Sequence, residues 1–371
     1  MKGELERHFL LALVIFFYTA NVVRAQGYQS LYENEPAISG PMGLSDDNIG
    51  IFHQTFRDAI TLARHTAIYW PCDAATDQRF LRYFRPEHAE LVKNMFRQIA
   101  GIDFNADLND EATVKKLVVE PFAYSKKFNR LSIAFLQDHK GLDPPNGPGI
   151  SPDLNCVDVN PRTGTPTRAY NVPIYNGKSA LMSICPEVYV RELMLSDVLN
   201  PPSWAIDPSK DQSKGPQYYD GFGCENLGDI DSDWMWSTGA VTLHELFHFP
   251  GLFEDVPDYN ARMPIAVELE GTIPAAGPID HCVSDWFGKD PPDGYGAYNA
   301  KRLNELQPTD KDNDMLQWEA IYNADNYVWF ALSSYYSKQC GRDFKACPDN
   351  ASAWPKRKFP PWPFNIDPPK P

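Results

Sequence analysis

The chain has 371 residues, 43% of them hydrophobic, and its formal net charge is -15 at pH 7. An acidic balance of this size repels phosphate groups, so it argues against nucleic acids and anionic membranes as partners. The length suits one large domain or two small ones.

The first 25 residues have the composition of a secretory signal peptide. Charged residues within 1–7 precede an apolar run over 9–18, and small residues precede the expected cleavage after Ala25. The apolar run is shorter than the roughly 20 residues that span a membrane. We therefore expect a secreted protein without a membrane anchor, with one domain over residues 26–345 and a proline-rich tail over residues 346–371.

The cysteine content fits an oxidising compartment. Most of the cysteines should form disulfides there, leaving one odd thiol. Cys340 and Cys347 are close enough in sequence to close a short loop with each other. Asn350, within Asn-Ala-Ser, is a glycosylation acceptor. The seven cysteines are Cys72, Cys156, Cys185, Cys224, Cys282, Cys340 and Cys347.

The first half of the domain is predicted to be helical. Ser45 can cap a helix whose apolar residues follow helical spacing as far as Pro71. Two more helices are expected over residues 77–84 and 87–100. Structural roles are expected for the histidines on these helices, none of which has a partner at ligand spacing: His53, His65 and His88.

Short strands and long loops are predicted to follow. Residues 131–136 alternate weakly, and residues 181–185 form a short apolar run. Residues 141–153, 160–173 and 200–217 are rich in proline, glycine, asparagine and aspartate, which is typical of loops. Apolar segments resume on both sides of each, so we interpret them as connections within one domain.

Residues 244–248 carry the most informative pattern, His-Glu-Leu-Phe-His. A helix is expected here, capped by Ser237 or Thr238 and ended near His248 by the proline two residues later. Residues four apart lie on one face of a helix, so the two imidazoles can bind one zinc ion. Glu245 between them can reach a metal-bound water as general base.

The last part of the domain is again predicted to be helical. One helix is expected over residues 299–306 and a longer amphipathic one over 314–332, continuing towards Lys338. The aromatic residues of the longer helix are expected in the core. The proline-rich segment 354–371 is expected to be extended or disordered.

Several motifs together resemble the deuterolysin-like, or aspzincin, metalloendopeptidases of fungi, including their lysine-specific relatives. They are His-Glu-Leu-Phe-His-Phe-Pro-Gly at 244–251, Tyr-Gly at 295–296, and Asn-Ala-Asp-Asn-Tyr-Val-Trp-Phe-Ala at 323–331. Segments 80–84 and 185–189 are also similar. The resemblance implies an α+β, mainly helical, zincin-like domain with a small antiparallel sheet edging the active-site cleft. It also implies hydrolysis of internal peptide bonds at a zinc held by two histidines and an aspartate.

The resemblance covers roughly residues 45–338, and it assigns the zinc ligands His244 and His248 directly. The family pattern Gly-Thr-x-Asp-x-x-Tyr-Gly implies that an aspartate before Tyr295 is the third ligand. Gly-Thr is missing here and proline stands three before Tyr295, so the loop differs in length. We favour Asp293, with Asp290 second. Tyr295 would donate a hydrogen bond to the oxyanion.

A rival set of ligands follows from spacing alone. Glu254 stands where metzincins place their last ligand after His-x-x-x-His-x-x-Gly, and Met263 could provide a Met-turn. Carboxylate oxygen suits zinc in either arrangement, so spacing does not decide between Glu254 and the aspartates. Asp280 and His281 are further candidates.

The predicted function is a secreted zinc metalloendopeptidase that uses a zinc-activated water and Glu245 as general base. Its partners would be protein or peptide substrates, and it would act as a monomer. If acidic residues near the cleft, such as Asp285, Asp290 or Asp293, face the bound peptide, they would favour a basic side chain in the substrate. The alternative is a non-catalytic extracellular zinc-binding protein on a protease-like fold.

Overall fold

The computed structural model describes residues 26–119, 124–138, 156, 166–174, 177–203, 205, 221–263, 282–288, 290–306, 319–348 and 361–367. The predicted signal peptide and the glycosylation acceptor Asn350 lie outside the described residues. No helix in the described part is long and apolar enough to cross a membrane.

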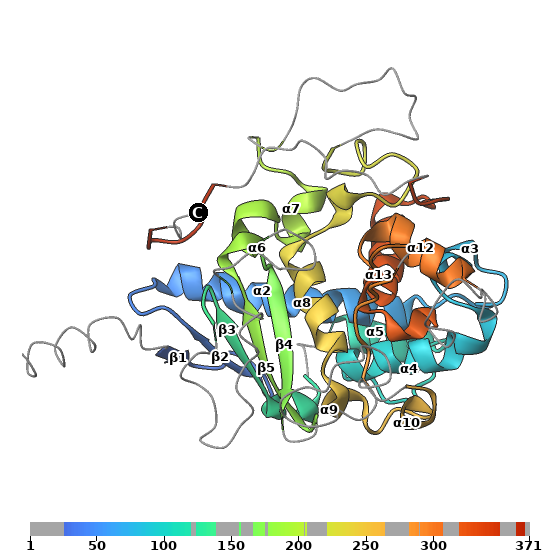
Figure 1. Ribbon diagram of the computed structural model, residues 1–371, viewed down its shortest axis with the longest axis horizontal. Coiled ribbons are helices and arrows are strands. Elements are labelled where there is room, and N and C mark those ends of the chain that lie inside the picture. The colour runs from blue at the N-terminus through green and yellow to red at the C-terminus, as the bar shows by residue number, and fades with distance from the viewer. Residues whose placement is uncertain are drawn as a thin grey trace, which may run out of the picture.

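The fold is α+β, and its strands form one sheet that lies against a helical layer (Figure 1). The described part contains eleven α-helices and five strands. The strands are β1 (Gln26–Tyr28), β2 (Ala37–Gly40), β3 (Leu131–Phe135), β4 (Ala169–Ile174) and β5 (Ser179–Ile184).

The sheet is mixed, so the expectation of an antiparallel sheet is wrong. In the order β1-β2-β3-β5-β4, the outer pairs are antiparallel, but β3 runs parallel to both β2 and β5. The chain between β2 and β3 passes through four helices before it returns to the sheet, and a crossover of that length permits parallel pairing. Ile133 on β3, opposite Ile38 and Met182, is fully buried.

Two strand predictions are confirmed and one loop prediction is wrong. β3 and β5 occupy the predicted segments 131–136 and 181–185 within two residues. β4 falls largely within 160–173, which the sequence predicts to be loop. It is an edge strand that contains Pro173, and an edge position tolerates a residue without a backbone N–H.

The first predicted helices are confirmed with their caps. The Ser45 side chain accepts a hydrogen bond from the Asn48 backbone N–H, and Gly101 ends the third helix in a left-handed conformation with φ 67°. These elements are α2 (Asp46–Ile68), α3 (Gln78–Tyr83) and α4 (Ala89–Ala100). A further helix, α5 (Glu111–Val119), was not among the predicted elements.

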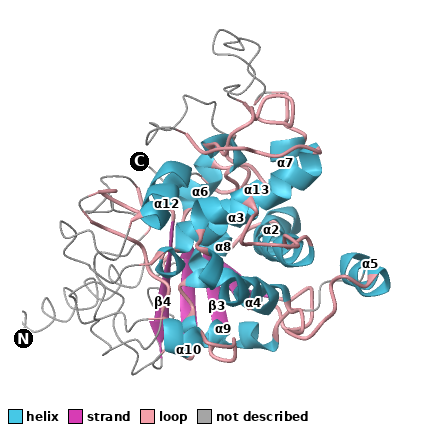
Figure 2. Cartoon of the chain, turned by 90° about the vertical axis from the view of Figure 1, so that its right-hand side faces the viewer, coloured by secondary structure: helices cyan, strands magenta, loops and turns pink. Residues whose placement is uncertain are grey.

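The helix of the His-Glu-x-x-His pattern, α8 (Thr238–Phe247), lies at the centre of the molecule. All its residues are buried, and it packs against α2, against β4 and against α13 (Ala324–Cys340), as Figure 2 also shows. Residues 314–318 of the predicted helix 314–338 lie outside the described residues, and α13 itself begins at Ala324. The other helices are α6 (Pro186–Arg191), α7 (Leu195–Leu199), α9 (Pro250–Phe253), α10 (Tyr259–Arg262) and α12 (Gly296–Glu305).

A glycine lets α8 approach α2 closely. A Cβ atom on Gly239 would lie only 2.4 Å from the Cβ of Asp58, so no larger residue fits there without a shift of backbone. Asp58 is buried at this crossing, where it accepts hydrogen bonds from Gln54 Nε2 and from the Leu195 backbone N–H. Burial raises the pKa of the Asp58 carboxyl to about 6.

Asp58→Asn is expected to stabilise the protein at neutral pH and to flatten the dependence of stability on pH. A carboxyl whose pKa is raised by folding stabilises the fold fully below its unfolded pKa, and this contribution is lost as pH rises through the folded value of about 6. The gain at pH 7 could reach about 3 kcal/mol. Urea unfolding between pH 4 and 8 measures it. Asp343→Asn, at an exposed carboxyl, serves as control, and a pH profile for Asp58→Asn parallel to wild type would contradict the prediction.

Two disulfides tie distant segments together. Cys156 bonds Cys185, and Cys224 bonds Cys340 at the end of α13, so the suggested Cys340–Cys347 pair is wrong. Three cysteines remain thiols rather than the expected one: Cys72, Cys282 and Cys347.

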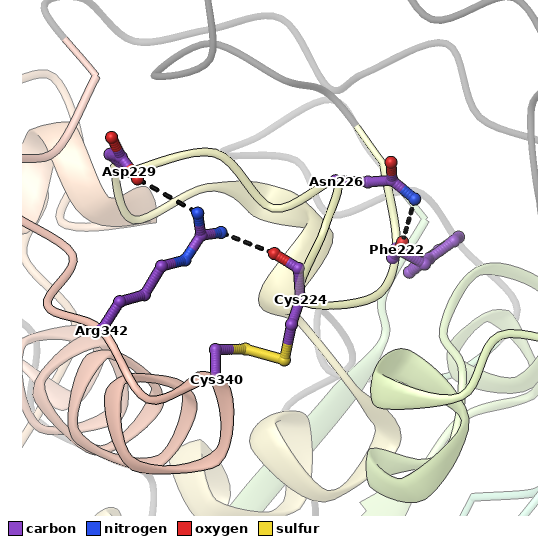
Figure 3. Close-up of a disulfide and its surroundings, with 6 residues drawn as sticks. All are labelled: Phe222, Cys224, Asn226, Asp229, Cys340 and Arg342. Atoms are coloured by element: carbon purple, nitrogen blue, oxygen red, sulfur yellow. Dashed lines mark hydrogen bonds and ion pairs between the residues drawn. A yellow bond between two sulfur atoms is a disulfide. The ribbon is translucent and has the colours of Figure 1, made fainter.

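Arg342 reinforces the second disulfide. Its guanidinium donates to the Asp229 carboxylate at 3.1 Å and to the Cys224 carbonyl oxygen at 2.6 Å (Figure 3). The loop that contains Cys224 is thereby held to the C-terminal end of α13 by a covalent bond and by a charged side chain.

Removing the Cys224–Cys340 bond is expected to destabilise the fold more than removing Cys156–Cys185. The two bonds span 116 and 29 residues. The chain-entropy relation assigns about 4.8 kcal/mol to the longer loop and about 3.6 kcal/mol to the shorter. Denaturant unfolding of the two paired Cys→Ser variants tests the order. A larger loss for the shorter loop would show that strain or residual unfolded structure outweighs loop entropy.

Part of the proline-rich tail packs on the core instead of extending away from it. Phe364 is buried against Phe52 and Tyr189, with ring centroids 5.3 and 5.0 Å apart. The Asn48 side chain exchanges hydrogen bonds with Pro363 O and the Asn365 N–H. The expectation of an extended or disordered tail is therefore wrong for residues 361–367.

Candidate metal centre

Helix α8 brings together the imidazoles of His244 and His248, the two histidines predicted to bind zinc. The Ser237 hydroxyl accepts a hydrogen bond from the Ala240 N–H and begins the helix, as expected, and His248 is its C-terminal cap. His244 and His248 project from one face, and their Nε2 atoms lie 3.1 Å apart.

Asp285 is the acidic residue that joins the two imidazoles. Its Oδ1 atom lies 3.2 Å from His244 Nε2 and 3.5 Å from His248 Nε2. Within the described residues, His244, His248 and Asp285 form a group that can hold a metal ion. The buried Oδ1 atom of Asp285 has no hydrogen-bond partner.

The other nitrogen of each imidazole faces an acceptor. His244 Nδ1 lies 2.7 Å from Asp325 Oδ1, and His248 Nδ1 lies 2.9 Å from the carbonyl oxygen of Val283. Each Nδ1 therefore carries a hydrogen, and a neutral ring leaves its Nε2 lone pair free. When both rings are neutral, two lone pairs and a carboxylate oxygen converge on one point, where a cation would relieve their mutual repulsion.

The charges around this point also favour a bound cation. Asp325 and Glu245 are buried, and Asp285 is largely so. Across the described segments, no lysine or arginine side chain forms an ion pair with any of these three carboxylates. Carboxylates taken out of water need a cationic partner or a metal.

The pKa values respond to this clustering. Burial alone would lower the pKa of His244, but the Asp285 and Asp325 carboxylates outweigh burial and raise it well above its usual value. Burial alone would raise the pKa of Asp285, but the two imidazoles outweigh it and hold that pKa well below the usual range. Burial raises the pKa of Glu245. A bound cation would displace protons from the imidazoles, because metal ligands bind in their deprotonated form.

A tight loop brings Asp285 back to Tyr295. The Asn323 side chain joins the two ends of this loop, accepting from the Trp286 N–H and donating to Gly294 O. A Cβ atom on Gly294 would lie 2.2 Å from Asn323 Oδ1, so a larger residue here would displace the Asn323 side chain. The Tyr295 hydroxyl then donates to Asp285 Oδ2 at 2.9 Å.

The sequence-favoured third ligand lies beside the group but outside it. Asp293 Oδ1 accepts from the Tyr295 N–H and from Asn299 Nδ2, and so shapes the turn before α12. Asp290 is exposed and pairs with Arg302 at 3.5 Å. The structure brings Asp285, not Asp293 or Asp290, to the two imidazoles.

The metzincin-like alternative has no support in the geometry. Glu254 forms ion pairs with Lys127 and Arg130 at 2.6 and 2.7 Å, away from the metal-binding group. Gly251 is the glycine of the His-x-x-x-His-x-x-Gly pattern, and its N–H donates to Gly177 O in the β4–β5 turn. Met263 is buried at the end of α10. Asp280 and His281 lie outside the described residues.

The sequence indicates Asp285 only as one of several acidic residues near the cleft, not as a metal ligand. Asp285 stands ten residues before Tyr295, whereas the family pattern places the aspartate three before the tyrosine. Two glycines and two prolines in the interval are turn-forming residues that mark an excursion of the chain. That signal could have indicated an insertion between ligand and tyrosine.

Comparison with protein-family models, with curated proteins and with solved structures finds no match.

Proposed function

We propose that this chain is a secreted zinc metalloendopeptidase that hydrolyses internal peptide bonds. The observation that carries the proposal is the convergence of His244, His248 and Asp285, with the Glu245 carboxyl on the same helix. A metal site with three protein ligands leaves one position open, which is typical of catalytic rather than structural zinc.

The distances within the group are close to those of a zinc site. Zinc binds imidazole nitrogen and carboxylate oxygen at about 2.0–2.2 Å in a tetrahedral arrangement, so its ligand atoms lie about 3.3–3.5 Å apart. The three separations here are 3.1, 3.2 and 3.5 Å. When bound, zinc supplies a Lewis acid that activates water and polarises a carbonyl group.

Glu245 is the proposed proton carrier. It would accept a proton from the attacking water and deliver it to the leaving amine. Burial raises its pKa, which brings it closer to neutrality and favours both halves of that transfer.

Tyr295 is the proposed hydrogen-bond donor of the site. Burial and the Asp285 charge raise its pKa well above the usual value, so the phenol keeps its proton. That proton is donated to Asp285 Oδ2. Turning it from Asp285 towards the oxyanion of the tetrahedral intermediate would fulfil the role expected from the family resemblance.

A strand edge beside the site supports a peptide substrate. β4 is the last strand of the sheet in the described part of the chain and packs against α8. Asn171 on β4 donates its side-chain N–H to the carbonyl oxygen of Glu245 at 2.8 Å. An extended peptide can pair with an exposed strand edge through its backbone.

The test is cleavage of a peptide library by the purified protein. We expect internal cleavage that a chelator stops and added zinc restores. Zinc bound with no peptide cut would favour the alternative, an extracellular zinc-binding protein without catalysis. The Glu245 carboxyl argues against that alternative, because binding zinc does not require a buried acid between the two histidines.

A further inference from the structure

Asp325, near the start of α13, contacts two parts of the metal centre with its two oxygens. It is 2% exposed. Its Oδ1 accepts from His244 Nδ1 and its Oδ2 from the Gly296 backbone N–H, both at 2.7 Å. No other side chain in the described part of the chain bonds His244 Nδ1.

We propose that Asp325 is a positioning residue that fixes the tautomer of His244 and thereby sets the metal affinity of the site. The proposal rests on the metal centre of the proposed function but not on its peptidase activity. Residues that hydrogen-bond a metal ligand in this way typically contribute about 10- to 100-fold to affinity.

The direction of each hydrogen bond follows from the groups involved. A backbone N–H can only donate, so Gly296 commits Oδ2 of Asp325 to accepting. A carboxylate Oδ1 also accepts only, so the hydrogen shared with His244 sits on Nδ1. A neutral His244 then has its lone pair on Nε2, which faces His248 and Asp285.

Asparagine at position 325 would reverse this arrangement while keeping the shape of the side chain. Its carbonyl oxygen must remain on the Gly296 N–H, because an NH₂ group there would face another donor. The amide NH₂ then points at His244 Nδ1 and requires a lone pair on that atom. The ring hydrogen moves to Nε2, where it blocks metal binding.

The same carboxylate links His244 to the other side of the site. Gly296 follows Tyr295, whose hydroxyl donates to Asp285 Oδ2. His244, Asp325, the Tyr295–Gly296 turn and Asp285 therefore form a closed ring of contacts. A substitution at position 325 acts on one ligand directly and on Asp285 through the turn.

The first test is zinc affinity measured by competition with a chromogenic chelator. We expect Asp325→Asn to weaken zinc binding by about 10- to 100-fold. Asp343→Asn, an exposed change just beyond the same helix, should leave it unchanged. Equal affinity of wild type and Asp325→Asn would overturn the proposal.

The second test reads the tautomer itself from long-range ¹H–¹⁵N correlation spectra of the metal-free protein at alkaline pH. Wild-type His244 should carry its hydrogen on Nδ1, and Asp325→Asn should move it to Nε2. A purely structural role for Asp325 would not move this signal. If Asp325→Asn does not fold, the wild-type spectrum alone decides, because a hydrogen on Nε2 of His244 would overturn the proposal.

Neither readout involves peptide cleavage. A protein that binds zinc with the expected tautomer and cuts no peptide would refute the proposed function and leave the role of Asp325 intact. If the wild type is an active peptidase and Asp325→Asn keeps both the zinc affinity and the His244 tautomer, the role of Asp325 is refuted and the proposed function stands.

Discussion

Replacing Glu245 with glutamine is expected to slow peptide cleavage by about 10²- to 10⁴-fold, the usual contribution of a general base, and to change zinc affinity little. The amide keeps the size of the side chain but cannot accept the proton of the attacking water. Glu245 is not part of the metal-binding group, so zinc should still bind. Initial rates on a cleaved peptide, with zinc content measured on the same samples, separate the two effects.

Glu254→Gln is the matched control for this experiment. Glu254 lies on the same stretch of chain and pairs with Lys127 and Arg130 rather than with the imidazoles. Its replacement should leave both cleavage and zinc binding near wild type. Full activity in Glu245→Gln would eliminate the proposed general base, and loss of zinc in Glu254→Gln would restore the metzincin-like arrangement.

Replacing Asp285 with asparagine is expected to weaken zinc binding by more than the roughly 10- to 100-fold caused by losing a hydrogen-bonding partner of a ligand. The change removes the only charged atom that faces both imidazole Nε2 atoms within the described group. It also removes a negative charge that balances the cation. Cleavage should fall with the zinc content.

Asp293→Asn also tests which aspartate is the third metal ligand, because it changes the residue favoured by the sequence and leaves Asp285 intact. Asp293 uses Oδ1 to accept from Tyr295 N–H and Asn299, and the asparagine oxygen can keep both bonds. Zinc affinity should therefore stay within about threefold of wild type, the scatter expected for a change outside the ligand set. Stronger loss in Asp293→Asn than in Asp285→Asn would return the third position to Asp293.

The sequence was most informative where the chemistry is local. His244, Glu245 and His248 belong to one helix, so their common face follows from helical spacing alone. The Ser45 and Ser237 caps are equally local, and both are present. These features depend on residues within a few positions of one another.

The sequence was least informative where the contacting residues lie far apart along the chain. Asp285 reaches the imidazoles through a loop whose ends are joined by Asn323, nearly forty residues further along. The Cys224–Cys340 pair spans 116 residues. β4 is held by its pairing with β5, not by its own alternation. Tertiary contacts decide each of these, and no short pattern in the sequence encodes them.

The metal centre is complete only when the start of α13 is in place, because Asn323 holds the Asp285 loop and Asp325 orients His244. The histidines are synthesised well before α13, yet the third ligand and the orientation of His244 depend on that helix being in place. A growing or unfolded chain would therefore lack a complete chelating group, and zinc would bind almost exclusively to the finished fold. An ion that binds only the folded state would raise the free energy of unfolding. The increase is about 4 kcal/mol when the free zinc concentration is a thousandfold above the dissociation constant.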